Sequence, residues 1–347
     1  MNAIAVRGNR LRAYTEFLFA ILYFFLAREV ARHAAQGMVN DQWSPLLNQA
    51  ILAGMLLAGY SVMGLVFDRQ ANPIAAQGLP LRAGWKSETG LGLAVGWALA
   101  VACVIPLALD GGIAIRLAFD GAAWGWLASD TVFFALAALA EEIAFRGYGF
   151  QRFADALGRT AAALSFAVFY AILQRLQPGA SLASVAAAMA YALLLALAYL
   201  RTRALWVSWG LNFAWKASRA LLFGLAISGN GSHSPIVQGD PMGPFWLTGG
   251  GFGIEGSWIT VLLLLAAMPV VYRLTRDLDF LYNAPVIVPG GIPVDIDEAA
   301  RRQHEAAMGS VEPAAPALVQ ILPIAPSANP EPPVPEDAAP ASGNESR

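Results

Sequence analysis

The sequence predicts an all-α fold, a polytopic transmembrane helix bundle of about eight spans. Hydrophobic residues make up 57% of the 347-residue chain and charged residues only 13%, too little charge to cover the surface of a soluble protein of this length. The mean hydropathy is +0.53. Apolar runs of about 20 residues, each long enough to cross ~30 Å of hydrocarbon, recur along the chain. Membrane lipid is therefore the expected surrounding of these helices.

The apolar runs place the expected spans in chain order. They lie near residues 13–27, 46–66, 90–109, 122–145, 159–175, 182–200, 204–227 and 257–273. The first and fifth runs are short and can extend into their flanks, and the fourth ends in acidic residues. Together they predict a transmembrane domain over residues 1–276.

The character of the chain changes from about Asp277. Residues 311–347 are rich in Pro, Ala and Glu, and a segment of that composition cannot bury a core. We therefore predict that residues 277–347 form a disordered cytoplasmic tail.

The basic residues predict the orientation of the spans. With an even number of spans and a cytoplasmic N-terminus, the cytoplasmic segments hold Arg7, Arg10, Arg12, Arg69, Arg82, Lys86, Arg146, Arg152, Arg159, Arg201, Arg203, Arg273 and Arg276. The opposite loops hold fewer, and the long loop 228–256 holds no Lys or Arg. Because basic residues concentrate on the cytoplasmic side, we expect a multi-pass protein of the cell membrane with both termini in the cytoplasm.

Several kinds of site are not visible in the sequence. The formal net charge is −2, and no basic stripe with interleaved aromatic residues is present, so no nucleic-acid partner is expected. Cys103 is the single cysteine, which excludes a disulfide framework. The histidines, His33, His233 and His304, lack the spacing of metal ligands. We therefore predict neither a metal nor a cofactor.

Ionisable residues within a span are costly, which makes each of them a candidate functional residue. The fourth span ends with Glu141 and Glu142, followed by Arg146. On a helix Glu142 and Arg146 share a face and can pair, whereas Glu141 points about 100° away from Glu142. An unpaired, desolvated carboxylate suits a general base that activates water. The same residues also fit a charge cluster at the membrane interface without chemistry.

The seventh span carries a polar stripe of Asn212, Lys216 and Arg219, at spacings of four and three residues. Residues at these spacings share one helix face, which we expect to point into the bundle toward the acids of the fourth span. Two interpretations are open here. One is a structural ion pair of Lys216 with Glu141 or Glu142, and the other is a catalytic cleft.

Two further features have ordinary structural interpretations. Gln174 lies at the end of the fifth span, where a lone glutamine is an interfacial cap. Residues 251–256 match the G-x-G-x-x-G expression, but they lack the preceding strand and the βαβ context that dinucleotide binding requires. We interpret them as a tight turn that leads into the last span.

The acidic motif and the segments after it resemble the CPBP family, the CAAX-prenyl-protease and bacteriocin-processing membrane proteins also called the Abi family. The first motif is Glu141-Glu142-x-x-x-Arg146, continued by Gly147-Tyr148 and Gln151-Arg152-Phe153. The resemblance covers about residues 125–260 and continues through 177–181, 199–206, 212–215, 224–229 and 247–257. This ordered series over three helices is more specific than the acidic motif alone.

The resemblance implies an eight-helix intramembrane endopeptidase, in which the first-motif glutamate activates water. By this resemblance Glu141 is the water-activating residue, and Glu142 with Arg146 supports it. Where the family has two histidines and an asparagine on the later helices, this chain has Gln174, Asn212 and Lys216. Amide groups can still donate hydrogen bonds to a developing oxyanion, worth on the order of 3 kcal/mol per donor, but they are poor ligands for zinc.

Three functions follow as hypotheses. The first is a divergent CAAX-protease-like endopeptidase that acts on a hydrophobic or lipidated peptide or on a membrane protein, with Glu141 as base. Its electrophilic donors would be Gln174, Asn212 and Lys216. The second is a catalytically silent relative that binds such peptides or scaffolds other membrane proteins, because the expected histidines are missing. The third, a transporter or channel, has less support because no broken-helix pair or inverted repeat is visible.

One distance bears on this choice. Direct contact between Lys216 and Glu141, without room for water, favours the silent relative, and an open cavity favours catalysis.

Overall fold

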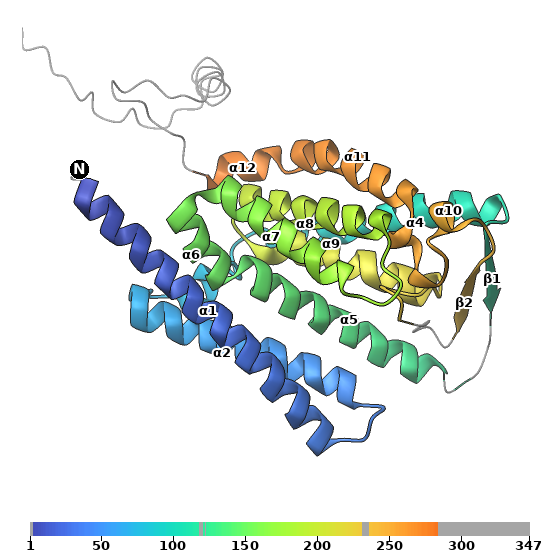
Figure 1. The fold of residues 1–347 in the computed structure, drawn as a ribbon, viewed down its shortest axis with the longest axis horizontal. Coiled ribbons are helices and arrows are strands. Elements are labelled where there is room, and N and C mark those ends of the chain that lie inside the picture. Colours follow the sequence, from blue (N-terminus) through green and yellow to red (C-terminus); the bar gives the residue numbers. More distant parts are fainter. Residues whose placement is uncertain (1–2, 118–120, 122, 231–235, 284–347) are drawn as a thin grey trace, which may run out of the picture. The chain divides into compact units, whose positions relative to one another are not determined.

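Helices follow the apolar runs of the sequence in a computed structural model of the chain (Figure 1). The structure describes residues 3–117, 121, 123–230 and 236–283. Each predicted span overlaps one of the longer helices; the seventh continues into the π-helix η1 (Ser218–Leu222) and ends there, short of the predicted residue 227. These helices are α1 (Ala3–Met38), α2 (Ser44–Asp68), α4 (Trp85–Leu109), α5 (Ala123–Arg146), α7 (Arg159–Arg175), α8 (Leu182–Thr202), α9 (Leu205–Ala217) and α11 (Trp258–Leu274). The predicted all-α class is confirmed.

The number of helices that can cross a membrane is smaller than the number of predicted spans. In the described part of the chain, α2, α4, α8 and the helical stretch Ala123–Leu157 are long and apolar enough to do so. Helix α11 reaches that length only together with α12 (Arg276–Tyr282), across a bend of 55°. Helices α7 and α9 have 17 and 13 residues, fewer than the roughly 20 that a span needs. The chain is thus a membrane protein, and its count of about eight spans stays a prediction.

Short elements connect the long helices. They are α3 (Pro73–Ala76), α6 (Tyr148–Leu157), α10 (Phe245–Thr248), the 3₁₀ turns η2 (Gly250–Phe252) and η3 (Ile254–Gly256), and an antiparallel ladder of β1 (Ile113–Leu117) with β2 (Val237–Pro241). The register of this ladder pairs Ile115 with Gly239. The sequence does not predict these strands, because they are too short to show a period.

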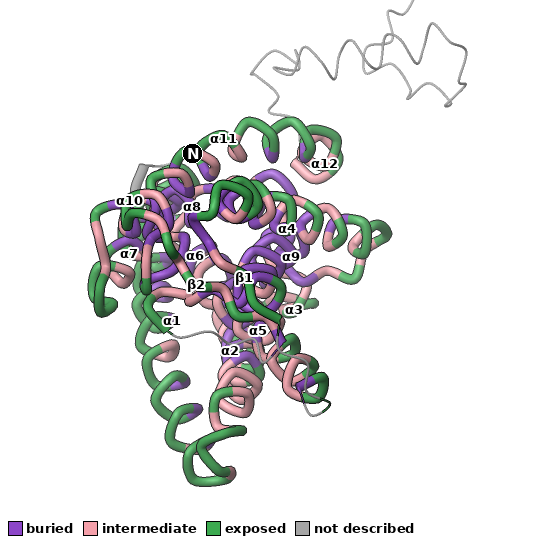
Figure 2. The backbone as a smooth tube through the Cα atoms, turned by 90° about the vertical axis from the view of Figure 1, so that its right-hand side faces the viewer, coloured by how far each residue is buried: buried purple, intermediate pink, exposed green. Residues whose placement is uncertain are grey.

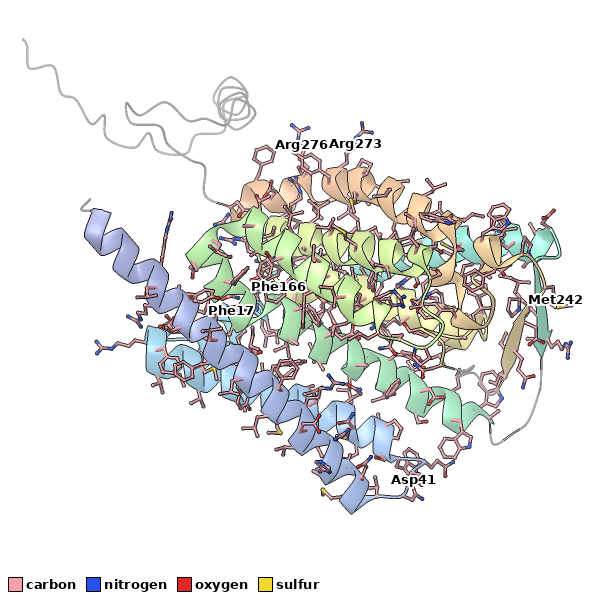
Figure 3. All side chains as sticks on the ribbon, in the orientation of Figure 1. Phe17, Asp41, Phe166, Met242, Arg273 and Arg276 are labelled. Carbon is pink, nitrogen blue, oxygen red and sulfur yellow. The ribbon has the colours of Figure 1, made fainter. Side chains whose placement is uncertain are left out.

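Helix α8 lies at the centre of the bundle, and its residues are mostly buried in Figure 2. Within an apolar stretch of 18 residues, 67% of α8 is buried, against 22% of α2. Helix α1 packs on the periphery, where Phe17 meets Phe166 of α7 with ring centroids 6.1 Å apart (Figure 3). Many large apolar side chains of α1 stay exposed, which fits a surface that faces lipid rather than water.

Glycines allow α4 and α9 to approach closely. A Cβ atom at Gly92 would lie 2.2 Å from the Val207 carbonyl oxygen, and one at Gly96 would lie 2.5 Å from that of Leu211. Without side chains at these positions the two backbones come into contact, a packing mode common where lipid surrounds helices. Helix α9 is thereby held at a fixed depth and rotation, and its polar stripe is held with it.

The end of α5 is fixed from the other side by the helix that follows it. Gly147 breaks the helix, and α6 then runs beside α1. Arg152 of α6 bonds Asp68 of α2 at 2.7 Å and Asp155 at 2.8 Å. Arg152 Nη1 also lies 3.6 Å from Glu16 of α1, so this ion-pair cluster holds the turn after the acidic motif against the first two long helices.

The predicted boundary between membrane domain and tail falls at the start of α12. This helix packs on the end of α8, where Arg201 lies 2.9 Å from Asp279. The guanidinium of Arg82 lies 3.3 Å from the centre of the Tyr282 ring. Arg273 and Arg276 point away from the bundle in Figure 3. The rest of the predicted tail, residues 284–347, lies outside the described residues.

Candidate active site

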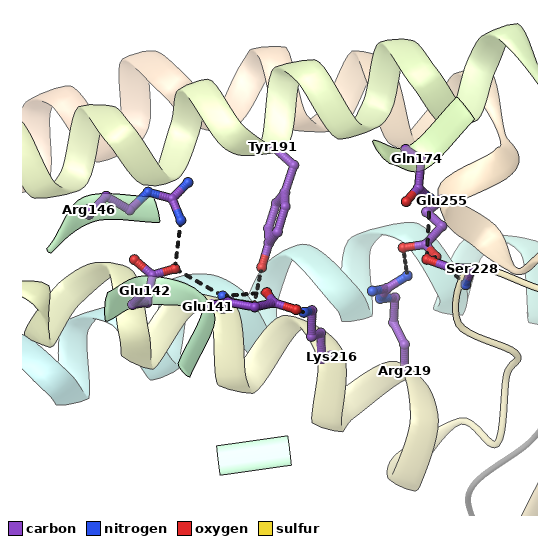
Figure 4. A network of polar contacts seen from close by, with 10 residues as sticks. Glu141, Glu142, Arg146, Gln174, Tyr191, Lys216, Arg219, Ser228 and Glu255 are labelled. Atoms are coloured by element: carbon purple, nitrogen blue, oxygen red, sulfur yellow. Dashed lines mark hydrogen bonds and ion pairs between the residues drawn. The ribbon is translucent and has the colours of Figure 1, made fainter. Parts of the chain in front are cut away.

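A cavity of about 520 Å³ lies among α5, α7, α8, α9 and the segment that leads into α11. Its size falls within the range of ~300–1,000 Å³ that ligand sites occupy. Four charged side chains line it among the described residues: Glu141, Lys216, Arg219 and Glu255. They form two separate ion pairs, Glu141 with Lys216 in the middle of Figure 4 and Arg219 with Glu255 on its right.

The first pair joins the acidic motif of α5 to the polar stripe of α9. Lys216 Nζ lies 2.5 Å from Glu141 Oε1, and Asn212 Nδ2 donates to Glu141 Oε2 at 3.2 Å. The Glu141 side chain is 33% exposed and that of Lys216 is 12% exposed. Glu141 therefore touches Lys216 directly and faces the open cavity at the same time. The direct contact that favours the silent relative and the open cavity that favours catalysis are therefore both present.

The neighbouring carboxylate is enclosed behind the cavity wall. Glu142 is completely buried, and Arg146 Nη1 lies 3.0 Å from its Oε1, as the spacing of four residues predicts. Arg146 also donates from Nη2 to the carbonyl oxygen of Ala192 on α8, at 3.2 Å. A buried carboxylate needs such a partner because an unpaired charge is strongly unfavourable there. Glu142 and Arg146 thus lock α5 against α8 directly beside Glu141.

Asn212 connects the two carboxylates. Its Nδ2 donates to Glu142 Oε1 at 2.9 Å in addition to Glu141, and its Oδ1 accepts from the hydroxyl of Tyr191 at 3.0 Å. Since two carboxylates on one side can only accept, the amide nitrogen must face them and the oxygen must face a donor. Tyr191 on α8 therefore selects the orientation of the Asn212 amide. The side chain of Asn212 is fully buried and cannot turn toward water.

The second pair ties the end of the polar stripe to the turn before α11. Arg219 Nη1 lies 2.8 Å from Glu255 Oε2, and the Ser228 hydroxyl donates to Glu255 Oε1 at 2.6 Å. The Ser228 backbone N–H donates to the same oxygen. Gln174 Nε2 reaches Ser228 Oγ at 3.2 Å from α7. Burial raises the pKa of Glu255, but Arg219 and the hydrogen bonds from Ser228 outweigh it and leave the pKa below its ordinary value.

The structure brings most of the predicted site residues together. Glu141, Lys216 and Gln174 line the cavity, and Glu142, Arg146 and Asn212 support Glu141 from behind. Gln174 bonds to Ser228 in the second cluster. It is therefore part of the cavity wall and more than an interfacial cap, though it makes no direct bond to Glu141.

Sequence reasoning missed Tyr191, Ser228 and Glu255. Residues 251–256, interpreted as a tight turn, do contain 3₁₀ turns, with Gly253 at φ 99°. The same stretch also supplies Glu255 to the cavity. One signal was present: Glu255 is an acid in a loop without Lys or Arg, while Arg219 is a base in an apolar span. Each needed a distant partner, because an unpaired charge in such a place is costly.

The groups around Glu141 do not fit a zinc ion. In the parts of the chain that the structure describes, no group of three or more His, Cys, Asp or Glu side chains could hold a metal. The residues that face Glu141 offer an amide and an ammonium group, Asn212 and Lys216. A protonated ammonium has no lone pair to donate to a metal, and zinc sites use imidazole, thiolate or carboxylate ligands.

Comparison with known proteins supports the predicted relationship. Residues 118–218 match the family model described as Type II CAAX prenyl endopeptidase Rce1-like. No curated protein and no solved structure matches the chain. The matched residues contain the acidic motif of α5, Gln174 of α7 and the Asn212–Lys216 stretch of α9. A match to the Rce1-like endopeptidases is consistent with the CPBP family. The predicted resemblance to that family is therefore confirmed over residues 118–218.

Proposed function

We propose that this chain is a multi-pass cell-membrane endopeptidase that hydrolyses a peptide bond with water activated by Glu141. Its substrate is a hydrophobic or lipidated peptide, or a membrane protein. The observation that carries the proposal is the position of Glu141: its carboxylate is 33% exposed on the wall of a cavity of about 520 Å³, beside an amide and an ammonium group. The match of residues 118–218 to the Rce1-like endopeptidases supports it.

The proposed reaction begins with a water molecule beside Glu141. Glu141 accepts a proton from this water while the water oxygen attacks the carbonyl carbon of the scissile peptide bond. The carbonyl oxygen becomes an oxyanion, and the C–N bond then breaks as Glu141 returns the proton to the leaving nitrogen. Each carboxylate oxygen of Glu141 has more than one acceptor site, so the bonds from Asn212 and Lys216 leave room for a water.

Lys216 has a defined part in this reaction. When Glu141 takes up the proton, its negative charge disappears and a new negative charge develops on the substrate oxygen. The ammonium of Lys216, released from a carboxylate that has become neutral, can then stabilise this oxyanion. Donors aimed at a developing oxyanion are worth on the order of 3 kcal/mol each. The ion pair with Glu141 holds the Lys216 ammonium in place before the substrate arrives.

We further propose that both termini of the chain face the cytoplasm. The distribution of basic residues supports this orientation, since the loop 228–256 contains no Lys or Arg. In that orientation Gln174 lies at the non-cytoplasmic end of α7, and Glu255 lies in a non-cytoplasmic loop. A substrate would then approach Glu141 through the part of the cavity that these residues line.

A specific observation favours a second candidate, a silent relative that binds such peptides without cleaving them. Both oxygens of Glu141 already accept a hydrogen bond, one from Lys216 at 2.5 Å and one from Asn212 at 3.2 Å. A carboxylate in direct contact with a cation can act solely as one half of an ion pair between two helices. In this candidate the cavity holds the peptide, and Glu141 serves only to join α5 to α9.

One assay separates the two candidates. The chain, purified in detergent, is incubated with a panel of prenylated peptides and of unmodified leader-type peptides, and cleavage is followed by mass spectrometry. The endopeptidase predicts a defined product that Glu141→Gln abolishes and the exposed control Glu29→Gln on α1 does not. Saturable binding without any product, for every peptide of the panel, would reject hydrolysis in favour of the silent relative.

A further inference from the structure

We propose that the crevice between the first part of α1 and the end of α2 binds a membrane lipid whose headgroup combines a phosphate with a primary ammonium. A cavity of about 720 Å³ lies there, and α6 supplies the rest of its wall. Among the described residues it shares none of its lining with the cavity beside Glu141. The lipid is therefore a ligand distinct from a peptide substrate, and the proposal does not depend on hydrolysis.

The wall of this second cavity holds acids and bases in unequal numbers. Arg152 of α6 lies 2.7 Å from Asp68 and 2.8 Å from Asp155. Glu16 of α1 lies 3.6 Å from Arg152 and 2.7 Å from Arg12. Three acids thus share two arginines, and this cluster has one more negative charge than positive charges. A cation that enters the cavity therefore meets a carboxylate without a full counter-charge.

The same wall presents exposed guanidinium groups. Arg69 directly follows α2, is exposed and lines the cavity. None of the ion pairs that line this cavity among the described residues includes Arg69. Arg12 is also exposed, and its contacts to Glu16 and to the carbonyl oxygen of Phe67 use two of its five N–H donors. An anion in the cavity therefore finds free guanidinium donors.

A headgroup with both charges matches this arrangement. Phosphate oxygens are strong acceptors for guanidinium groups. A primary ammonium carries three N–H donors, which suit carboxylates with spare acceptor sites, such as the exposed Asp155. A trimethylammonium has no N–H and is typically held by a cage of aromatic rings, whereas Phe67 is the one aromatic side chain among the described lining residues. The wall therefore favours a primary ammonium.

The crevice continues away from the charges as an apolar surface. Phe67, which lines the cavity, packs on Phe19 of α1 with ring centroids 6.1 Å apart. Phe19 is exposed, and so are Val62 and Val66, which share one face of α2. Val66 also lines the cavity. Exposed apolar side chains of this kind suit contact with lipid, so acyl chains can lie along them while the headgroup occupies the cavity.

The first test compares headgroups on the wild-type chain. Native mass spectrometry of the full chain in detergent measures the affinity for phosphatidylethanolamine, phosphatidylcholine and phosphatidylglycerol with identical acyl chains. We expect phosphatidylethanolamine to bind at least about tenfold more tightly than either, because the second lipid lacks N–H donors on its cation and the third lacks a cation. Equal binding of phosphatidylcholine, or equal or tighter binding of phosphatidylglycerol, would overturn the proposal.

A soluble headgroup separates a lipid from a free ion. Phosphoethanolamine without acyl chains carries the same two charges but makes no contact with the apolar surface of α1 and α2. It should displace phosphatidylethanolamine only at a concentration at least about 100-fold higher than that of the lipid. Displacement at equal concentration would reject a lipid as the ligand.

Two variants test the two halves of the wall. Arg69→Gln removes an exposed guanidinium and should weaken phosphatidylethanolamine and phosphatidylcholine alike by about tenfold, because both carry the phosphate. Asp155→Asn removes an acid and should weaken phosphatidylethanolamine alone, so its advantage over phosphatidylcholine shrinks. The matched controls are Arg28→Gln, exposed on α1, and Asp41→Asn, in the turn between α1 and α2 (Figure 3). They should change neither affinity.

The variants also distinguish a binding role from a purely structural one. Loss of a structural contact lowers the melting temperature measured without lipid and weakens every lipid equally, whereas the proposal requires the losses to differ between the two variants. Unchanged binding in both variants would contradict it. If either variant does not fold, the comparison of headgroups on the wild-type chain still decides.

Discussion

Lys216 on α9 lies 2.5 Å from Glu141 on α5, and this contact joins the two helices that carry the candidate chemistry. It gives the carboxylate a cation that can serve either as a counter-charge or as a hydrogen-bond donor to the substrate oxyanion. The contact is only partly shielded, since the Glu141 side chain is 33% exposed. The value of Lys216 to stability is therefore modest, and its value to the reaction is the quantity to measure.

Replacement of Lys216 by methionine keeps the length of the side chain and removes its charge. We expect the free energy of unfolding to fall by about 1–2 kcal/mol, less than the roughly 3–5 kcal/mol of a fully buried pair, because water screens part of the interaction. If the oxyanion role holds, kcat should fall about 100-fold. Steady-state kinetics and thermal unfolding in detergent measure both quantities. Lys86→Met, at an exposed position of α4, is the control and should change neither.

Removal of the Tyr191 hydroxyl tests the orientation of Asn212. In Tyr191→Phe the Asn212 oxygen loses its donor, so the amide is no longer held with its nitrogen toward the carboxylates. One lost hydrogen bond of about 1 kcal/mol corresponds to a decrease of several-fold in kcat, and KM should change less, because the Tyr191 ring that lines the cavity is kept. Tyr14→Phe, exposed on α1, is the comparison. A loss that appeared only in KM would argue against this role.

The glycine contact between α4 and α9 offers a prediction with an internal control. Gly96→Ala places a methyl group 2.5 Å from the Leu211 carbonyl oxygen, so the helices must separate. We expect a loss of about 1–3 kcal/mol in the free energy of unfolding. Gly90→Ala lies on the same helix, where an added Cβ meets nothing within 4 Å. It should instead stabilise the protein by up to about 1 kcal/mol, since alanine favours helix. Equal effects at the two positions would contradict the packing argument.

The ion pair of Glu255 with Arg219 should make stability depend on pH. Burial raises the pKa of Glu255, but the charge of Arg219 and the hydrogen bonds from Ser228 lower it more, and it lies below the ordinary value of 4.5. The unfolded chain therefore binds a proton before the folded protein does. The contribution of the pair is complete above that ordinary value and is lost as the pH falls through the lower pKa of the folded state.

Thermal unfolding of the wild type and of Glu255→Gln between about pH 7 and about pH 3.5 measures this dependence. The difference between their melting temperatures should be constant near neutral pH and should shrink below the ordinary carboxyl pKa. A difference that grew toward acid pH would contradict the assignment.

The positions of the long helices could be predicted because hydropathy is a sum over many residues. Each predicted span overlaps a helix, and the pairing of Glu142 with Arg146 follows from helix geometry alone. Short irregular segments, such as the break at Gly147 and the strands β1 and β2, contain too few residues to change the summed hydropathy.

The contents of the site could be predicted only in part. The stripe of Asn212 and Lys216 was expected to face the acids, but whether Lys216 touches Glu141 depends on the relative rotation and depth of two helices. No spacing within one helix determines these quantities. Glu255 escaped notice because its partner, Arg219, lies 36 residues away in the sequence. An interaction of that kind depends on how the chain folds back, which a linear pattern does not contain.

The contact of α4 with α9 has a consequence for how the protein can be divided. The family match covers residues 118–218 and contains α9, yet the two glycines against which α9 rests lie on α4, outside the match. The residues that match the family model therefore lack the helix against which α9 packs. A transplant of residues 118–218 into another membrane protein should place Asn212 and Lys216 correctly only if the host supplies a helix with glycines at the positions of Gly92 and Gly96. The bounds of the family match therefore differ from the bounds of the helix packing that positions the candidate site.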